Sequence, residues 1–382
     1  HGGEDILGLR NWLFQRLVEA HGFSAIAVES SFPRGRAVNE YVAGRGAASY
    51  DAVQETGFSH GFGQLEANRA LVEWMRDTNA DPGRRVTLRF YGFDSPTEMM
   101  YADSPRQTLT FVLDYLASVD SARAGAYRER IDPLLGQDAA WETPEAAMDP
   151  SKSIGLSPAA TALRIETEDL IAELRARRPE LVAHSNRSRY LEALQHASVA
   201  RQLLNYHAEV ARESSDRIVR LLSLREAAMA DNVAYIVSRE QDRGKVLVFA
   251  HNSHLQRGQA HWQLGPHALV WSPVGAHLAE MFGPRYAVIG SALGTSEANG
   301  IGQPEPGTLE ARLTAAPGPA RFIPTHRGQG LPAAEIAALP ARSGSMKNTT
   351  YFALTPQSLS DFDWLAVLNS TTYAVGGPSL PG

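Results

Sequence analysis

The sequence has 382 residues, with 36 Lys or Arg, 42 Asp or Glu, 12 His and no Cys. The absence of cysteine excludes disulfides, thiolate metal sites and a cysteine nucleophile. A net charge of −6 argues against a general nucleic-acid binder, which usually carries a basic surface. No apolar run reaches the length of a membrane helix, and no signal peptide is recognisable, so we expect a globular cytoplasmic protein.

The chain begins at His1, without an initiator Met. We therefore expect it to be a fragment of a longer protein, with room for an additional domain on its N-terminal side.

The first hundred residues alternate between helix and strand patterns. Leu9, Leu13 and Leu17 recur at every fourth position, which is typical of an amphipathic helix, and Gly22 follows as a helix-ending residue. The mostly apolar run after this helix has the character of a strand buried in a parallel sheet. In chain order, the predicted elements are a helix over residues 4–20, a strand over 23–28, a helix over 65–78 and a strand over 86–93.

The composition changes between residues 104 and 240, where Ala, Leu, Arg and Glu dominate and β-branched runs are scarce. Apolar stripes at helical spacing predict a helical bundle inserted into the chain. Its predicted helices cover residues 108–116, 158–177, 188–213 and 216–238. The predicted organisation is therefore a first part of an α/β core (1–103), a helical insertion (104–240) and a second part of the core (241–382).

The α/β pattern resumes after the insertion, beginning with the apolar run that ends before His251. The fold class that we predict is α/β: a mixed, largely parallel sheet flanked by helices, with a helical-bundle insertion. The further predicted elements are a strand over residues 245–250, a helix over 274–282 and strands over 286–291, 321–324 and 364–368.

Ionisable residues stand at the ends of three predicted strands: Glu29, Asp94, and the pair His251 and His254. In open α/β sheets the ligand site lies outside the carboxyl ends of the strands, so residues distant in sequence converge there. His1 extends the pattern. It precedes Gly2-Gly3 and a helix, so we expect it to end a strand formed by residues before it, beside Glu29.

Two imidazoles three positions apart, in His251-Asn252-Ser253-His254, form the most distinctive group. Imidazole is the side chain whose ordinary pKa suits proton transfer near neutral pH. The structural alternative is that Asn252 or Ser253 caps a helix and the histidines only flank it.

A second motif, Gly57-Phe58-Ser59-His60-Gly61, matches the G-x-S-x-G pattern of a serine nucleophile elbow. The elbow requires a buried strand directly before it, and residues 49–56 are mostly polar. We therefore interpret the motif as a loop.

Arg34 and Arg36 follow the strand that carries Glu29 and could hold an anionic or polar group of a substrate. Arginines at such positions are equally often ordinary surface residues.

With these residues in hand, the chain resembles the erythromycin esterase family over nearly its whole length. The matching stretches, in chain order, are residues 1–3 with the helix 9–22, then 25–29, 71–76, 90–94, 229–233, 250–254, 286–290 and 362–364.

The resemblance implies hydrolysis of a macrolactone-type ester by water, without a covalent serine. It implies that His1 is the general base, that Glu29 orients or polarises it, and that His251 and His254 contribute to the surroundings of the water and the oxyanion. Arg10 matches an arginine of the family's site. The residues predicted to bind substrate are Arg10, Arg34 and Asp94. The implied partner is a small-molecule ester, with no nucleic acid, no membrane and no required cofactor.

Two alternatives stay open. His1, Glu29, His251 and His254 form a set of nitrogen and oxygen ligands that could hold a divalent metal in a metal-dependent hydrolase. The chain could also be a binding module, or a non-esterase member of the fold that acts in polysaccharide or other metabolism.

Overall fold

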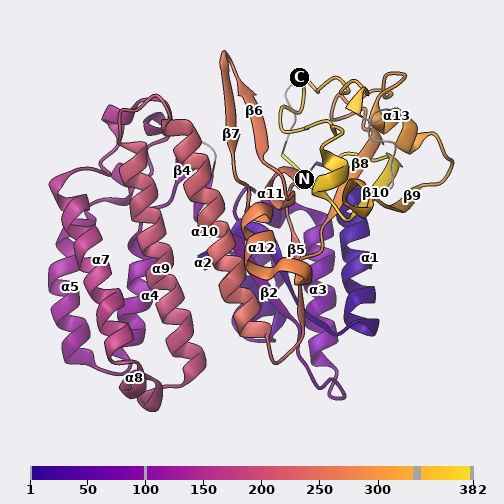
Figure 1. Cartoon of the computed structure of the whole chain (residues 1–382). Coiled ribbons are helices and arrows are strands. Elements are labelled where there is room, and N and C mark those ends of the chain that lie inside the picture. Colours follow the sequence, from indigo (N-terminus) through magenta and orange to yellow (C-terminus); the bar gives the residue numbers. More distant parts are fainter. Residues whose placement is uncertain (1, 99–100, 330–336, 379–382) are drawn as a thin grey trace. The chain divides into compact units, whose positions relative to one another are not determined.

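The computed structural model describes residues 2–98, 101–329 and 337–378, and the chain divides into two compact units (Figure 1). The α/β unit comprises residues 1–29, 34–92 and 236–382, and the helical unit comprises residues 30–33 and 93–235. The α/β unit is thus assembled from segments on both sides of the helical unit in the sequence.

The α/β unit contains most of the strands. Before the insertion come α1 (Glu4–Ala20), β1 (Phe23–Ser31), α2 (Phe32–Val42), η1 (Tyr50–Ala52), η2 (Phe62–Gln64), α3 (Glu66–Ala80) and β2 (Arg89–Asp94). After it come β5 (Lys245–Phe249), α11 (Asn252–Leu255), β6 (Ala260–Leu264), β7 (His267–Trp271), α12 (Val274–Phe282), η5 (Gly283–Arg285), β8 (Ile289–Thr295), α13 (Leu309–Thr314), β9 (Ala320–Pro324), η6 (His326–Gly328), α15 (Ser358–Asp361) and β10 (Trp364–Ser370).

The strands of this unit form two three-stranded sheets. The first has the order β2-β1-β5, with β1 and β5 parallel and Val28 opposite Phe249. The second has the order β8-β10-β9, with β10 parallel to β8 and antiparallel to β9. The predicted mixed, largely parallel α/β architecture is therefore confirmed, but its strands are divided between two sheets. The hairpin β6–β7 is a separate two-stranded ribbon that the sequence did not predict.

The core beside the first sheet explains why the N-terminal elements form as predicted. Phe14 of α1, Ile26 of β1, Met75 of α3 and Phe90 of β2 are all essentially inaccessible and belong to one apolar cluster. Burial of such large side chains contributes roughly 1.5–3 kcal/mol each. Gly22 ends α1 with a φ of 70°, a left-handed conformation that costs glycine little because it has no Cβ.

The helical unit is built around four helices that contact one another in a closed ring, because α4 and α7 each pack on both α5 and α9. Its elements are β3 (Thr97–Glu98), β4 (Tyr101–Ala102), α4 (Arg106–Ala117), α5 (Ser121–Leu135), α6 (Asp138–Trp141), η3 (Pro144–Ala147), η4 (Pro150–Lys152), α7 (Pro158–Ala176), α8 (Arg178–His184), α9 (Arg187–Val210) and α10 (Arg217–Glu240), the last of which continues into the α/β unit. Figure 1 shows α5, α4, α7 and α9 running alongside one another. Within the described ranges, no helix combines the length and apolar character needed to cross a membrane.

His207 of α9 is a buried histidine inside the helical unit. Its Nε2 lies 2.9 Å from the carbonyl oxygen of Asp103, and its ring packs edge-on against Trp141. Burial lowers the pKa of His207 from 6.5 to about 4, because the interior disfavours the charged imidazolium.

We expect this histidine to make the stability of the protein depend on pH. Between pH 6.5 and 4 the unfolded chain takes up a proton at His207 that the folded chain does not, so the free energy of unfolding falls as the pH falls, by up to about 3 kcal/mol. Chemical denaturation at several pH values measures the slope of the free energy of unfolding against pH. His207→Gln, which keeps a donor for Asp103, should flatten it, whereas the exposed control His184→Gln should not. An unchanged slope in His207→Gln would contradict the assignment.

Candidate active site

Glu29 and the histidine pair meet where β1 and β5 end side by side. The backbone N–H of His251 donates to Oε2 of Glu29 at 2.9 Å, and Oε1 of Glu29 lies 3.3 Å from Nε2 of His254. The parallel register explains this meeting, because Val28 pairs with Phe249 and the next residues of both strands reach the same edge. The structure thus brings together three of the predicted site residues. It also extends β1 two residues beyond Glu29, which therefore lies within the strand.

The carboxylate of Glu29 is buried, with 6% of the residue exposed, and the side chain of His254 is 13% exposed. A carboxylate held against an imidazole fixes the orientation of the ring and stabilises its protonated form. The pair is therefore suited to take up a proton from a neighbouring water and hold it.

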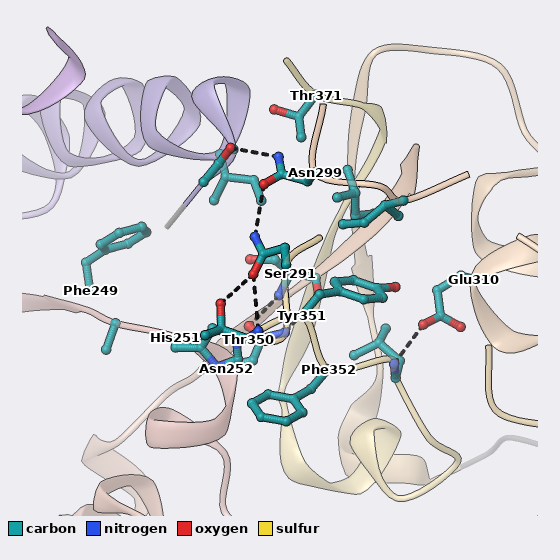
Figure 2. A pocket seen from close by; sticks show the side chains of 18 residues that line it. Phe249, His251, Asn252, Ser291, Asn299, Glu310, Thr350, Tyr351, Phe352 and Thr371 are labelled. Atoms are coloured by element: carbon teal, nitrogen blue, oxygen red, sulfur yellow. Dashed lines mark hydrogen bonds between the residues drawn. The ribbon is translucent and has the colours of Figure 1, made fainter. Parts of the chain in front are cut away.

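His251 and Asn252 shape the short helix α11 that carries this pair. His251 itself caps this helix, because its side chain accepts from the backbone N–H of Ser253. The capping residue is therefore neither Asn252 nor Ser253, the two that the sequence offered. The Asn252 side chain donates to the carbonyl of Ser291 at 2.8 Å and accepts from its N–H at 2.9 Å (Figure 2). This double hydrogen bond ties the end of the first sheet to strand β8 of the second.

A pocket with a cavity volume of about 110 Å³, continuous with an opening to solvent, lies beside this junction (Figure 2). Residues from the N-terminal segment, the end of β5, β8 and a loop before β10 line it: Gly2, Gly3, Ile6, Phe249, Ala250, His251, Asn252, Ser291, Leu293, Asn299, Ile301, Glu310, Asn348, Thr350, Tyr351, Phe352, Leu354 and Thr371.

Most of the polar side chains in the pocket wall hold the wall together. Asn299 donates to the carbonyl of Gly2 and accepts from Asn348. Glu310 is 1% exposed; its Oε1 accepts from the N–H of Leu354 at 2.7 Å, and its Oε2 has no hydrogen-bond partner among the described residues. This wall could not be predicted from the sequence. Its residues lie in loops without helix or strand periodicity, and only three-dimensional proximity relates them to His251.

Arg10 lies beneath the end of β5 and does not line the pocket. Its guanidinium is 4.8 Å from the ring centre of Phe249 and bonds to Asn11 and to the carbonyl of Ala67. Burial lowers the pKa of Arg10 to about 9. Arg10 therefore lies behind the site. Within the described part of the chain, its guanidinium has no contact with Glu29, His251 or His254.

The two other residues predicted to bind substrate have contacts elsewhere. Arg34, in α2, donates to the carbonyl of Phe58 at 3.4 Å. Asp94 belongs to the helical unit, where its fully buried carboxylate is held by the guanidinium of Arg225 at 3.1 and 2.6 Å. Neither residue lines the pocket, so a role in substrate binding stays a prediction for both.

His1, the base implied by family resemblance, lies outside the described residues. Ser59, the serine of the G-x-S-x-G motif, lies in a region of turns, and the segment directly before it, residues 50–58, contains no strand. Its Oγ is 2.8 Å from Nδ1 of His60, a residue with a left-handed φ of 58°. The strand-to-helix turn of a nucleophile elbow is therefore not present at this motif.

Among residues 2–98, 101–329 and 337–378, no three His, Asp or Glu side chains gather in an arrangement that could hold a metal ion. His1, the fourth member of the ligand set considered from the sequence, lies outside these residues.

The fold and these contacts define an α/β protein with a histidine–carboxylate site at the ends of parallel strands. Comparison with known proteins is consistent with that class. The family model described as erythromycin esterase matches residues 18–371. The erythromycin esterase type II of Escherichia coli is 23% identical over 290 residues, which are 74% of this chain and 64% of that protein. The chain belongs to the erythromycin esterase family.

Solved structures share the fold. A Bacillus cereus protein superposes with a TM-score of 0.75 at 17% identity, covering 99% of this chain and 88% of that one. A protein described as a succinoglycan biosynthesis protein gives 0.71 at 20% identity, with 98% and 86% coverage. A mutant of the erythromycin esterase EreC, in its open conformation, gives 0.66 at 21% identity, with 97% and 88% coverage.

Proposed function

We propose that this protein hydrolyses a carboxylic ester by direct attack of water, with a histidine as general base. The observation that supports this most strongly is the contact between the buried carboxylate of Glu29 and Nε2 of His254. The neighbouring His251 lines a pocket that opens to solvent. Membership of the erythromycin esterase family gives the same reaction class.

In the proposed reaction, the oxygen of a water molecule attacks the carbonyl carbon of the ester while an imidazole takes a proton from that water. The C–O bond to the alcohol then breaks, the leaving oxygen receives the proton, and the products are an acid and an alcohol. A positioned imidazole accelerates such a step about 10²–10⁴-fold. His1 stays the base implied by the family resemblance. Among the described residues, His254 is the imidazole that contacts Glu29, and we propose it as the second candidate for the base.

The pocket supports a substrate that carries both apolar and hydroxyl groups. Phe249, Tyr351 and Phe352 supply aromatic surface, and asparagine and threonine side chains of the wall supply polar groups. A macrolactone is the substrate type that the family suggests. The structural likeness to a succinoglycan biosynthesis protein favours an acylated sugar as the second substrate type.

We expect intact protein to convert at least one ester from a panel of macrolactones and acylated sugars. Mass spectrometry measures the reaction: a lactone gains the mass of one water, and an open-chain ester gives an acid and an alcohol. Activity that persists after chelation, with no metal bound to the protein, would remove the metal-dependent alternative. A panel that yields no product in either substrate class would contradict the proposal.

A further inference from the structure

A buried asparagine of the pocket wall, Asn299, holds the segment that leads into α1 (Figure 2). Asn299 is 2% exposed, and its Nδ2 donates to the carbonyl oxygen of Gly2 at 3.0 Å and to Oγ of Ser296 at 2.8 Å. A carbonyl oxygen can only accept, so the amide nitrogen of Asn299 must face Gly2. The Oδ1 atom of Asn299 accepts from Nδ2 of Asn348 at 2.9 Å. Both N–H groups of the Asn299 amide are therefore used within the protein.

The orientation of Asn348 is fixed in the same way. Its Oδ1 accepts from the backbone N–H of Thr350 at 3.2 Å and from the Thr350 hydroxyl at 2.7 Å. Because a backbone N–H can only donate, the amide nitrogen of Asn348 faces Asn299. The hydrogen bonds thus run in one direction, from the N–H of Thr350 through two side-chain amides to the carbonyl of Gly2. All four residues line the pocket.

Gly2 lies close against this wall. A Cβ atom at Gly2 would lie 2.8 Å from Oδ1 of Asn299 and 3.2 Å from the ring of Tyr373. The carbonyl of Gly2 also accepts from the backbone N–H of Ala374 at 3.2 Å. The carbonyl therefore has a main-chain donor, which no substitution removes, and a side-chain donor, which substitution of Asn299 removes.

We propose that Asn299 is a positioning residue for the general base, because it holds Gly2, the residue to which His1 is joined. This inference rests on the proposed ester hydrolysis with His1 as its base. Gly2 and Gly3 follow His1, and glycine gives the backbone more conformational freedom than any other residue. A base must lie within hydrogen-bond reach of the attacking water, and a displacement of about 1 Å can cost 10²-fold in rate. Contacts from outside the segment are therefore needed to hold the base in place.

Two substitutions separate a hydrogen-bond donor from a side chain that only fills space. Asn299→Asp keeps the shape and the acceptor for Asn348 but turns an oxygen toward the carbonyl oxygen of Gly2, whereas Asn299→Ala leaves Gly2 with the N–H of Ala374. We expect kcat to fall about tenfold in Asn299→Ala and about 10²-fold in Asn299→Asp, the cost of a displaced reacting group. KM should change little, because both N–H groups of Asn299 are already used. A kcat of Asn299→Asp close to the native value would overturn the inference.

Asn79→Ala is the matched control for the loss of a hydrogen-bonded amide. The Asn79 side chain donates to the carbonyls of Val42 and Leu88 and accepts from the N–H of Leu88, and it does not line the pocket. We expect Asn79→Ala to lower the melting temperature and to leave kcat unchanged. If Asn79→Ala lost as much kcat as Asn299→Ala, the loss would come from reduced stability, and the positioning role would be wrong.

A double-mutant cycle tests the contact even if Asn299→Asp fails to fold. The methyl group of Gly2→Ala would meet Oδ1 of Asn299, so Gly2→Ala should lower kcat. The same substitution should cost less in the Asn299→Ala protein, where that oxygen is absent. Changes in kcat that simply multiply in the double variant would contradict a direct coupling of the two residues.

The contact is also measurable without any substrate. The sequence has two Gly-Gly steps, Gly2-Gly3 and Gly376-Gly377, so protein labelled with ¹³C at glycine carbonyls and ¹⁵N at glycine amides gives two carbonyl–amide NMR signals. In Asn299→Ala the ¹³C resonance of the Gly2 carbonyl should move upfield, because the carbonyl loses a donor, and the Gly376 signal is the reference. A Gly2 signal that does not move would overturn the inference.

The two measurements also separate this inference from the proposed function. If the Gly2 signal moves but no ester is hydrolysed, the contact stands, whereas the positioning role and the proposed function fall. If esters are hydrolysed and the Asn299 variants keep the native kcat, the positioning role alone falls.

Discussion

His254→Ala should lower kcat/KM for ester hydrolysis by about 10²–10⁴-fold, the contribution of a positioned general base. The expectation follows from the distance of 3.3 Å between Nε2 of His254 and the buried carboxylate of Glu29. Steady-state kinetics on an ester identified in the substrate panel measures the loss. The melting temperature should stay close to that of the native protein, because Glu29 retains its hydrogen bond from the N–H of His251.

His254→Gln sharpens this prediction. The glutamine amide can still donate to Glu29 but cannot take up a proton, so it should be as inactive as His254→Ala while keeping the native fold. The exposed His184→Ala is the matched control for loss of an imidazole elsewhere in the chain. Full turnover by His254→Gln would show that His254 is not the base.

The second large effect that we expect concerns stability. Glu240, at the end of α10, is fully buried and accepts four hydrogen bonds: from Ser24 at 2.6 Å, Tyr91 at 2.8 Å, Arg89 at 3.1 Å and Arg243 at 3.2 Å. Removing one partner of a buried ionic network leaves the others uncompensated and costs about 3–5 kcal/mol. Glu240→Ala should therefore lower the free energy of unfolding by about that amount, measured by urea denaturation.

Glu19→Ala provides the comparison for Glu240. Glu19 pairs with Arg16 on an exposed face of α1, with both side chains more than half exposed, and such pairs contribute at most about 1 kcal/mol. Glu240→Gln should be nearly as unstable as Glu240→Ala, because the glutamine amide would present donors to a group of donors. A Glu240→Ala protein as stable as Glu19→Ala would show that the network contributes little.

The elements with a clear periodicity could be predicted from the sequence. The helix over residues 4–20 is observed as α1 with the same bounds, and the strand predicted over 245–250 is observed as β5, Lys245–Phe249. Both have strong local patterns, an apolar stripe in one case and a continuous apolar run in the other. The convergence of Glu29 with His251 and His254 could also be anticipated, because parallel neighbouring strands end at one edge.

What could not be predicted depends on contacts that leave no local pattern. Helix α5 carries Pro133 within it and has only a weak apolar stripe, and it is held by packing against α4 and α7. Asp94 is the last residue of β2, and Glu29 lies near the end of β1. The partner of Asp94, Arg225, lies 131 positions away in the sequence. The pocket wall at residues 348–354 is a loop that becomes recognisable only because it lies opposite His251 and Asn252.

The most direct test of the proposed mechanism is a single reaction in ¹⁸O-labelled water, quenched during turnover, with the masses of the protein and of the product acid both measured. Direct attack by water on the ester predicts one ¹⁸O in the acid and a protein whose mass is unchanged. An acyl adduct on the protein, at Ser59 or at any other residue, would contradict the proposed mechanism.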